Sequence, residues 1–195
     1  MAEYAVAITG ASGAAYGLAL IRALTGSGHT VHAVVSEGGA RVLRHECDVS
    51  INHKQPDPVV LAPEHADAIV AHASGNYGAS IASGSYPIVG MAVCPCSMGT
   101  LGRIAAGTAE NLVTRAADVC LKERRKLVLV PRETPLSAIH LENMLRLTRA
   151  GAVILPAAPG FYHGETRVVD LVRFVAARVM EQLGAAQDLT EPWQG

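Results

Sequence analysis

Three glycines stand in the stretch ITGASGAAYG, residues 8–17, directly after a short apolar run. They are Gly10, Gly13 and Gly17, and Ser12 lies between the first two. Glycines at a strand-to-helix turn let backbone N–H groups approach a phosphate, and the helix N-terminus favours its negative charge. The stretch therefore predicts a phosphate-binding turn, with a tight turn that binds no ligand as the alternative.

The glycine spacing does not indicate a nicotinamide dinucleotide. It departs from the G-x-G-x-x-G pattern of dinucleotide-binding turns. Short-chain dehydrogenases also need a Tyr and a Lys four residues apart, and no Tyr in this sequence has a Lys at that position. Both observations disfavour hydride transfer to NAD.

Two further turns carry hydroxyl groups after apolar segments. Ser36 follows TVHAVV, and the stretch CPCSMGT places four residues at the start of an expected helix: Ser97, Met98, Gly99 and Thr100. Taken alone, Ser97 also fits an ordinary helix N-cap. Three such turns in one sheet favour FMN, because hydroxyls and amides can hold its single phosphate and flexible ribityl chain.

A basic stretch, RAADVCLKERRKLVLVPRE, carries a carboxylate at its end. Arg115 and Lys122 are seven residues apart and so share one helical face, which can also be an ordinary solvated surface. Arg132 and Glu133 directly follow the apolar run KLVLV. Arg suits bidentate contacts with phosphate oxygens. Glu133 is a candidate proton shuttle, whether desolvation raises its pKa or Arg132 lowers it.

Alternating strands and helices are expected to position these residues. The expected strands cover 4–8, 30–35, 68–73, 88–94, 126–131 and 151–156. The expected helices cover 14–24, 38–47, 101–125 with a break near Gly107, 137–150 and 167–183. This alternation predicts an α/β fold, one doubly wound (Rossmann-like) domain over residues 1–195 with a parallel sheet and helices on both faces.

In such a fold, ligands bind beyond the carboxyl ends of the strands. That rule selects four loops: 9–13, 36–39, 95–100 and 131–137. Each of them contains one of the hydroxyl, glycine or Arg–Glu features described above. The sequence therefore predicts one site, built from all four loops at one edge of the sheet.

Composition narrows the class of protein. The 195 residues are 50% hydrophobic and 17% charged with a net charge of −1, so no broad affinity for nucleic acid or anionic membrane is expected. No apolar run reaches the ~18 residues that span a bilayer, and no secretory signal is evident, so a cytoplasmic location is expected.

The CPC spacing fits no zinc site, and no Asp-Asp-x-x-Asp cluster offers magnesium ligands. We expect buried structural thiols and no metal.

Longer stretches resemble the UbiX-type flavin prenyltransferases. They are GASGAAYG, CPCSMGTLGRIAAG, NLVTRAADVCLKERRKLVLVPRETPLSAIHLENMLRL and GAVILPAAPGFYH, in the family's order and over nearly the whole chain. The family is similar in fold to FMN-dependent cysteine decarboxylases, whose Asn-containing motif is replaced here by PRETPLSAIH. The resemblance implies transfer of a dimethylallyl group from dimethylallyl monophosphate to N5 and C6 of reduced FMN. The product, prenylated FMN, would serve UbiD-type decarboxylases.

The resemblance also implies site residues. Ser12 and Glu133 would be catalytic, and FMN would be bound by Gly10, Ala11, Ser12, Ser36, Ser97, Met98, Gly99, Thr100 and Arg132. The prenyl phosphate would be bound by Tyr162, Arg178, Lys122, Arg115 and Trp193. Glu46 is a further candidate residue for this site. The family implies no metal and a homo-dodecamer with sites at subunit junctions, where the C-terminal tail (184–195) would pack on a neighbouring subunit.

Other interpretations remain open at this point. The chain could be an FMN-dependent decarboxylase in its own right, or a non-catalytic FMN-carrying subunit of a decarboxylase. Tyr162 could be an ordinary core aromatic, and Arg178 could form a surface ion pair, the commonest role of an Arg on a helix. Trp193 could pack on its own domain.

Overall fold

A parallel sheet forms the centre of the computed structural model, which describes residues 1–162, 164 and 167–191. In spatial order, its strands are β3 (Ile69–His72), β2 (Thr30–Val35), β1 (Glu3–Ile8), β4 (Gly90–Cys96), β5 (Lys126–Pro131) and β6 (Val153–Ile154). All neighbouring pairs are parallel. The chain builds outward from β1 to β3, then returns to β4 on the other side of β1. This reversal makes the carboxyl ends of β1 and β4 the switch point where ligands bind in such folds.

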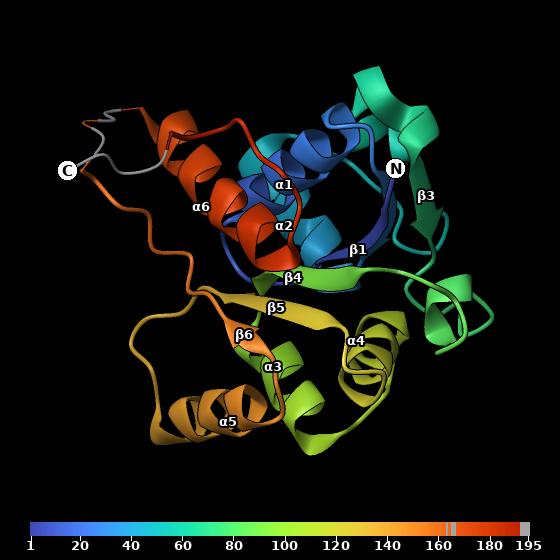
Figure 1. The fold of residues 1–195 in the computed structure, drawn as a ribbon, viewed down its shortest axis with the longest axis vertical. Helices are drawn as coiled ribbons and strands as arrows, with labels where there is room; N and C mark the ends of the chain where they lie inside the picture. The colour runs from blue at the N-terminus through green and yellow to red at the C-terminus, as the bar shows by residue number, and fades with distance from the viewer. Residues whose placement is uncertain (163, 165–166, 192–195) are drawn as a thin grey trace.

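Helices cover both faces of the sheet (Figure 1). One layer holds α1 (Ala14–Gly26), α2 (Glu37–Cys47) and α6 (Val168–Leu183), and the other holds α3 (Met98–Ala106), α4 (Leu112–Lys122) and α5 (Ala138–Arg149). Short 3-10 helices lie in the connections at Pro58–Val60, Pro63–Ala68 and Ser80–Ala82. The predicted fold class, a parallel sheet between two helical layers, is confirmed.

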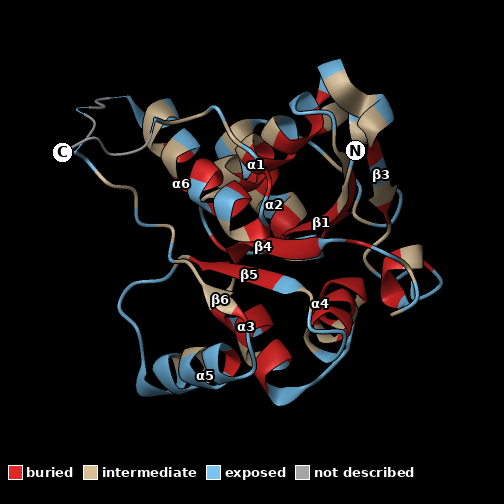
Figure 2. Ribbon diagram, in the orientation of Figure 1, coloured by how far each residue is buried: buried red, intermediate tan, exposed pale blue. Residues whose placement is uncertain are grey.

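The hydrophobic core lies on both sides of the sheet (Figure 2). Every residue of β4 is buried, which explains why that strand reads as a continuous apolar run instead of an alternating one. Helix α1 lies so close to the sheet that a Cβ on Gly17 would collide with the Cys94 carbonyl oxygen. Buried small residues thus bring the start of α1 near the ends of β1 and β4.

Three cysteines belong to this core. Cys94, Cys96 and Cys120 are buried and free, as expected for structural thiols. Burial raises the pKa of Cys96 and of Cys120 to about 12, so both are protonated at neutral pH. Across the described parts of the chain, no helix combines the length and apolar character needed to cross a membrane.

One predicted strand is shorter in the structure, and one predicted helix break is present. The strand expected at 151–156 is reduced to Val153–Ile154, because Pro131 on β5 has no N–H group to donate to the Leu155 carbonyl oxygen and continue the ladder. The segment still follows β5, since the Leu155 amide donates to the Leu129 carbonyl oxygen and the Ala157 amide to that of Pro131. The break predicted near Gly107 is confirmed, where a φ of 71° ends α3.

Candidate active site

The turn after β1 is joined directly to the turn after β4. The Thr9 hydroxyl donates a hydrogen bond to the Pro95 carbonyl oxygen (2.8 Å) and accepts one from the Ser97 amide (2.8 Å). Thr9 is buried. Since β1 and β4 are neighbours in the sheet, their carboxyl ends meet and one side chain can bridge them. Two turns that the sequence presents separately therefore form one structure at the switch point.

The turn after β2 reaches the same place. The Ser36 amide donates to the Ile8 carbonyl oxygen (3.0 Å), and the Ser36 hydroxyl caps α2 by accepting from the Gly39 amide (3.0 Å). Gly10 and Gly38 approach each other backbone to backbone, because a Cβ on Gly10 would lie only 3.2 Å from the Gly38 Cα. The N-terminus of α2 thus lies beside the glycine turn.

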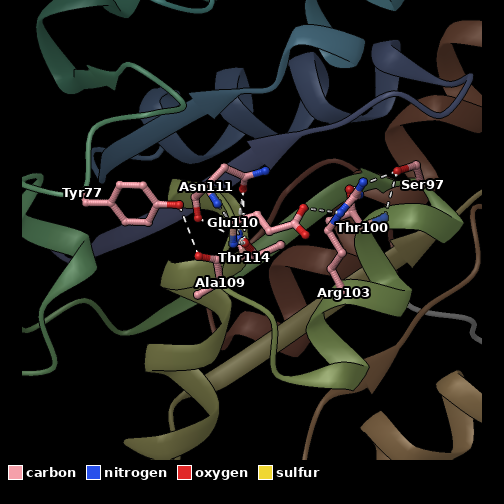
Figure 3. A network of polar contacts seen from close by, with 8 residues as sticks. All are labelled: Tyr77, Ser97, Thr100, Arg103, Ala109, Glu110, Asn111 and Thr114. Carbon is pink, nitrogen blue, oxygen red and sulfur yellow. Dashed lines mark hydrogen bonds and ion pairs between the residues drawn. The ribbon is translucent and has the colours of Figure 1, made fainter.

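Helix α3 begins at this point with a capped N-terminus (Figure 3). The Ser97 hydroxyl accepts a hydrogen bond from the Thr100 amide (3.3 Å) and lies 3.0 Å from the Thr100 hydroxyl. The N-cap role of Ser97 is therefore confirmed. Met98 and Gly99 belong to the first turn, whose amides have no carbonyl partner within a helix. Such amides are suited to bind an anion.

Arg132 completes the group from the end of β5. Its Nε donates to the Ser12 carbonyl oxygen (3.1 Å), so it spans the end of β4 to reach the glycine turn. Gly13, next to Ser12, has a φ of 103°, a conformation that glycine adopts most readily. Residues 9–13, 36–39 and 97–100 together with Arg132 are called the loop cluster below. The structure brings these predicted FMN-binding residues together.

Glu46, in the last turn of α2, fixes the start of α1. Its Oε2 accepts hydrogen bonds from the amides of Gly13 (2.8 Å) and Ala14 (3.0 Å). Desolvation by partial burial raises the pKa of the Glu46 carboxyl. Hydrogen bonds from the Ser12 side chain and the two amides outweigh that effect, and the net pKa is below its ordinary value. The sequence around Glu46 gives little indication of this role. The sequence signal for such a role is a carboxylate in the last turn of a helix, where the helix dipole disfavours negative charge.

Glu133 lies one residue beyond Arg132 and is exposed. Its Oε1 accepts a hydrogen bond from the Thr134 amide (3.1 Å). This local contact holds the carboxylate on its own loop, next in sequence to the Arg132 contact with the glycine turn. The arrangement leaves the Glu133 carboxylate accessible at the edge of the loop cluster.

Tyr162 and Arg178 are connected through Phe174. The Tyr162 ring meets the Phe174 ring edge-on, with centroids 5.7 Å apart. Phe174 and Arg178 are one turn apart on α6 and line a cavity of about 380 Å³ with residues 153–156, Ala158, Val175 and Gln182. We call this the edge cavity. The Arg178 guanidinium pairs with Glu181, so the surface ion pair considered from the sequence is confirmed.

The edge cavity adjoins the end of β5. Leu155 and Pro156 line it, and the neighbouring Ala157 amide donates to the Pro131 carbonyl oxygen (3.0 Å). Pro131 is the residue before Arg132. One wall of the edge cavity therefore continues into the backbone that presents Arg132 to the loop cluster.

Arg115 and Lys122 lie elsewhere in the chain. The Arg115 Nε donates to the Ala82 carbonyl oxygen (3.1 Å) and its Nη1 pairs with Asp118, while Lys122 pairs with Glu123. Lys122 precedes β5, whereas Arg132 follows it. Six strand residues span roughly 20 Å at ~3.3 Å each. A single chain therefore does not bring Lys122 to the loop cluster.

Two other predictions concern the tail and metals. Trp193 lies outside the described residues. Where the chain is described, no group of three or more His, Cys, Asp and Glu side chains is placed to hold a metal ion.

Comparisons with known proteins show which family this chain belongs to. The family model described as Flavoprotein matches residues 2–180. Flavin prenyltransferase UbiX of Pseudomonas aeruginosa is 48% identical over 192 residues, which cover 96% of this chain and 92% of the relative.

Two solved structures share the fold. AnUbiX (PadA1), crystallised with FMN and dimethylallyl pyrophosphate, has a TM-score of 0.90 at 39% identity, covering 100% of this chain and 98% of that chain. The dodecameric FMN-dependent UbiX-like decarboxylase of Escherichia coli O157:H7 has a TM-score of 0.87 at 44% identity, covering 99% of both chains. On this near full-length identity, the chain belongs to the family of UbiX flavin prenyltransferases.

Proposed function

We propose that this chain transfers a dimethylallyl group from dimethylallyl monophosphate to N5 and C6 of reduced FMN and releases phosphate. Family membership supports this, as does AnUbiX, which was crystallised with FMN and dimethylallyl pyrophosphate. The observation that carries the proposal is the convergence of three capped or glycine-rich turns and Arg132 at the switch point. Prenylated FMN would pass to a UbiD-type decarboxylase in the cytoplasm.

The loop cluster offers the groups that FMN needs. Backbone amides at the starts of α2 and α3 and the hydroxyls of Ser36, Ser97 and Thr100 suit a phosphate and a ribityl chain. In this proposal the binding residues are Gly10, Ala11, Ser12, Ser36, Ser97, Met98, Gly99, Thr100 and Arg132. FMN is here the prenyl acceptor, that is, a substrate.

The edge cavity would hold the dimethylallyl phosphate. Breaking its carbon–oxygen bond creates phosphate anion and positive charge on the allyl carbons. The Arg178 cation would stabilise the departing phosphate, and the ring of Tyr162 would shelter the allyl group. Cationic side chains would thus do what a magnesium ion does for other allylic donors, so the proposal requires no metal.

Arg115 and Lys122 would serve the prenyl phosphate of a neighbouring subunit. Lys122 lies a strand length from Arg132 within one chain, and the Escherichia coli relative is a dodecamer. We therefore propose a dodecamer with sites at subunit junctions, in which Trp193 and the tail over 184–195 pack on a neighbour.

Ring closure joins the far allyl carbon to C6: the allyl double bond takes up one proton, and C6 loses one. Glu133, accessible at the edge of the loop cluster, would accept that proton, and the released phosphate is the alternative base. Ser12 would orient the reacting edge of FMN. Its hydrogen bond to Glu46 would hold the hydroxyl in one position during this step.

One experiment tests the proposed function. The purified protein is incubated without oxygen with reduced FMN and dimethylallyl monophosphate, and the flavin is then examined by mass spectrometry. A gain of one prenyl unit is expected. Unmodified flavin, under conditions where the Pseudomonas aeruginosa relative works, would exclude the transferase and leave the FMN-carrying subunit. A parallel sample with dimethylallyl diphosphate shows whether that donor is also accepted.

The decarboxylase alternative has its own assay. The name of the Escherichia coli structure includes decarboxylase, so release of carbon dioxide from aromatic acids by the purified protein is measured with FMN alone. We expect none unless reduced FMN, dimethylallyl monophosphate and a UbiD-type partner are all supplied. Carbon dioxide release by this chain alone would support the alternative.

A further inference from the structure

Arg103 reaches back along α3 to the helix start. It stands in the last turn of α3 by sequence, where an Arg ordinarily complements the helix dipole. Side chains on a helix lean toward its N-terminus, however, and Gly99, one turn earlier, has no side chain. The Arg103 Nη1 lies 3.5 Å from the position that a Cβ of Gly99 would occupy. Its guanidinium thus lies against the first turn, near Thr100 (Figure 3).

An ion pair with Glu110 holds the guanidinium there. The Arg103 Nε is 2.7 Å from the Glu110 Oε2. The Glu110 amide donates to the hydroxyl of Thr114 (3.0 Å), which is buried, and the Tyr77 hydroxyl donates to the Ala109 carbonyl oxygen (3.2 Å). The backbone on which Glu110 is carried is therefore fixed by its neighbours. Arg103 and Glu110 form an organised ion pair beside the Ser97–Thr100 turn.

We infer that Arg103 is a second cation of the FMN site, which attracts the FMN phosphate while Glu110 weakens its field. The inference rests on the proposed binding of FMN at the loop cluster. Arg132 enters that cluster from β5, whereas Arg103 reaches the first turn of α3 from the same helix. A phosphate monoester carries nearly two negative charges at neutral pH. A fixed charge within about 10 Å acts on it at ordinary salt concentrations.

Two charge changes with opposite expected signs test this. Dissociation constants for FMN and for riboflavin, which lacks the phosphate, are measured by flavin fluorescence. Arg103→Gln should raise the constant for FMN about three- to tenfold, and Glu110→Gln should lower it about twofold, because roughly 1.4 kcal/mol corresponds to tenfold. Neither change should alter riboflavin binding. High salt should reduce both effects.

A purely structural ion pair predicts something else. Each variant breaks the same pair, so both would weaken FMN binding in the same direction, and that result would overturn the inference. An equal loss of FMN and riboflavin affinity in Arg103→Gln would overturn it too. Should Arg103→Gln fail to fold, two other variants still show whether charge governs FMN binding. They are Arg103→Lys, which keeps the charge, and Glu110→Gln.

Arg149→Gln is the matched control. Arg149 lies with Arg124 and Arg125, which precede β5 and so belong to the edge of the sheet opposite the loop cluster. Its loss should leave the dissociation constant for FMN unchanged, and an equal effect there would reduce Arg103 to general surface charge and overturn the inference. Wild-type protein that binds no FMN would remove the proposed function itself. Normal wild-type binding with an unaffected Arg103→Gln would remove only this inference.

Discussion

The loop cluster and the edge cavity are built in different ways. In the loop cluster, hydrogen bonds join residues far apart in the chain: Thr9 contacts Pro95 and Ser97, and Arg132 contacts Ser12. At the edge cavity, the contacts of Arg178 are local, because Glu181 follows three residues later on the same helix. The side chain of Arg178 is 48% exposed.

This difference suggests separate roles for the loop cluster, in FMN binding, and for the edge cavity, in turnover. A site whose members hold one another is organised before its ligand arrives, which limits the entropy lost on binding. A half-exposed Arg with one local partner can change partner without disturbing the fold. We therefore expect changes in the loop cluster to affect folding and FMN binding together. Changes at the edge cavity should affect turnover alone.

The largest effect is expected from Gly39→Ala. A Cβ at this position would collide with the Ile8 carbonyl oxygen, so β1 and α2 must separate. Such overpacking costs about 1–3 kcal/mol or more of the free energy of unfolding, and FMN binding should be lost. Urea unfolding and FMN titration measure both quantities. Gly75→Ala is the control, since no atom lies within 4 Å of its Cβ position; comparable damage there would refute the packing explanation.

Arg178→Gln should give the next largest effect, and only on catalysis. Loss of the cation at the departing phosphate should lower kcat/KM about 100-fold, while the dissociation constant for FMN stays unchanged. Arg178→Lys keeps the charge but not the planar fork, so we expect partial activity. Rates of prenylated FMN formation provide the measurement. If FMN affinity fell in parallel with the rate, the two sites would not be separable as described.

The sequence predicted the loop cluster for a geometric reason. The carboxyl ends of parallel strands lie at one edge of a sheet, so loops that follow strands must meet there. That rule needs only the strand positions, which the apolar runs ending before Thr9, Ser36 and Arg132 supplied. The meeting of Ser36 with the glycine turn also follows from the pairing of β1 with β2.

Positions that depend on a side chain's direction could not be predicted in this way. The seven-residue spacing of Arg115 and Lys122 gives a shared helical face, but not that Lys122 lies a strand length from Arg132. Glu46 reaches α1 only because α2 packs beside it. By sequence Arg103 belongs to the last turn of α3, and only the structure shows that its guanidinium lies over Gly99 in the first turn. These contacts arise from packing between elements, which local sequence patterns do not encode.

A smaller effect is expected from Thr9→Val. The change leaves the Ser97 amide without its hydroxyl partner, whereas the Pro95 carbonyl oxygen keeps the Thr9 amide (3.2 Å). An unpaired donor costs about 1–3 kcal/mol when it is buried. The dissociation constant for FMN should rise about tenfold as the two turns loosen. Thr25→Val is the control, because the Thr25 hydroxyl binds carbonyls within its own helix. Equal losses in both variants would mean that the tie between the turns has no special importance.

The smallest expected effect is on how the stability of the protein depends on pH. Hydrogen bonds from Ser12, Gly13 and Ala14 hold the pKa of the Glu46 carboxyl below its ordinary 4.5. A carboxyl with a lowered folded-state pKa contributes stability above its unfolded pKa, and loses that contribution as the pH falls through the folded value. Unfolding of wild type and Glu46→Gln is therefore compared at pH 7 and below pH 4. The variant should be less stable at pH 7, and the difference should shrink in acid.

Glu142→Gln, an exposed change on α5, is the control for this comparison. Its stability relative to wild type should not follow the pattern of Glu46→Gln. A difference for Glu46→Gln that stays constant with pH would show that the side chain acts through its shape and not its charge. In that case Ser12 would be positioned by packing alone, and the loop cluster would owe its order to the uncharged hydrogen bonds of Thr9, Ser36 and Ser97.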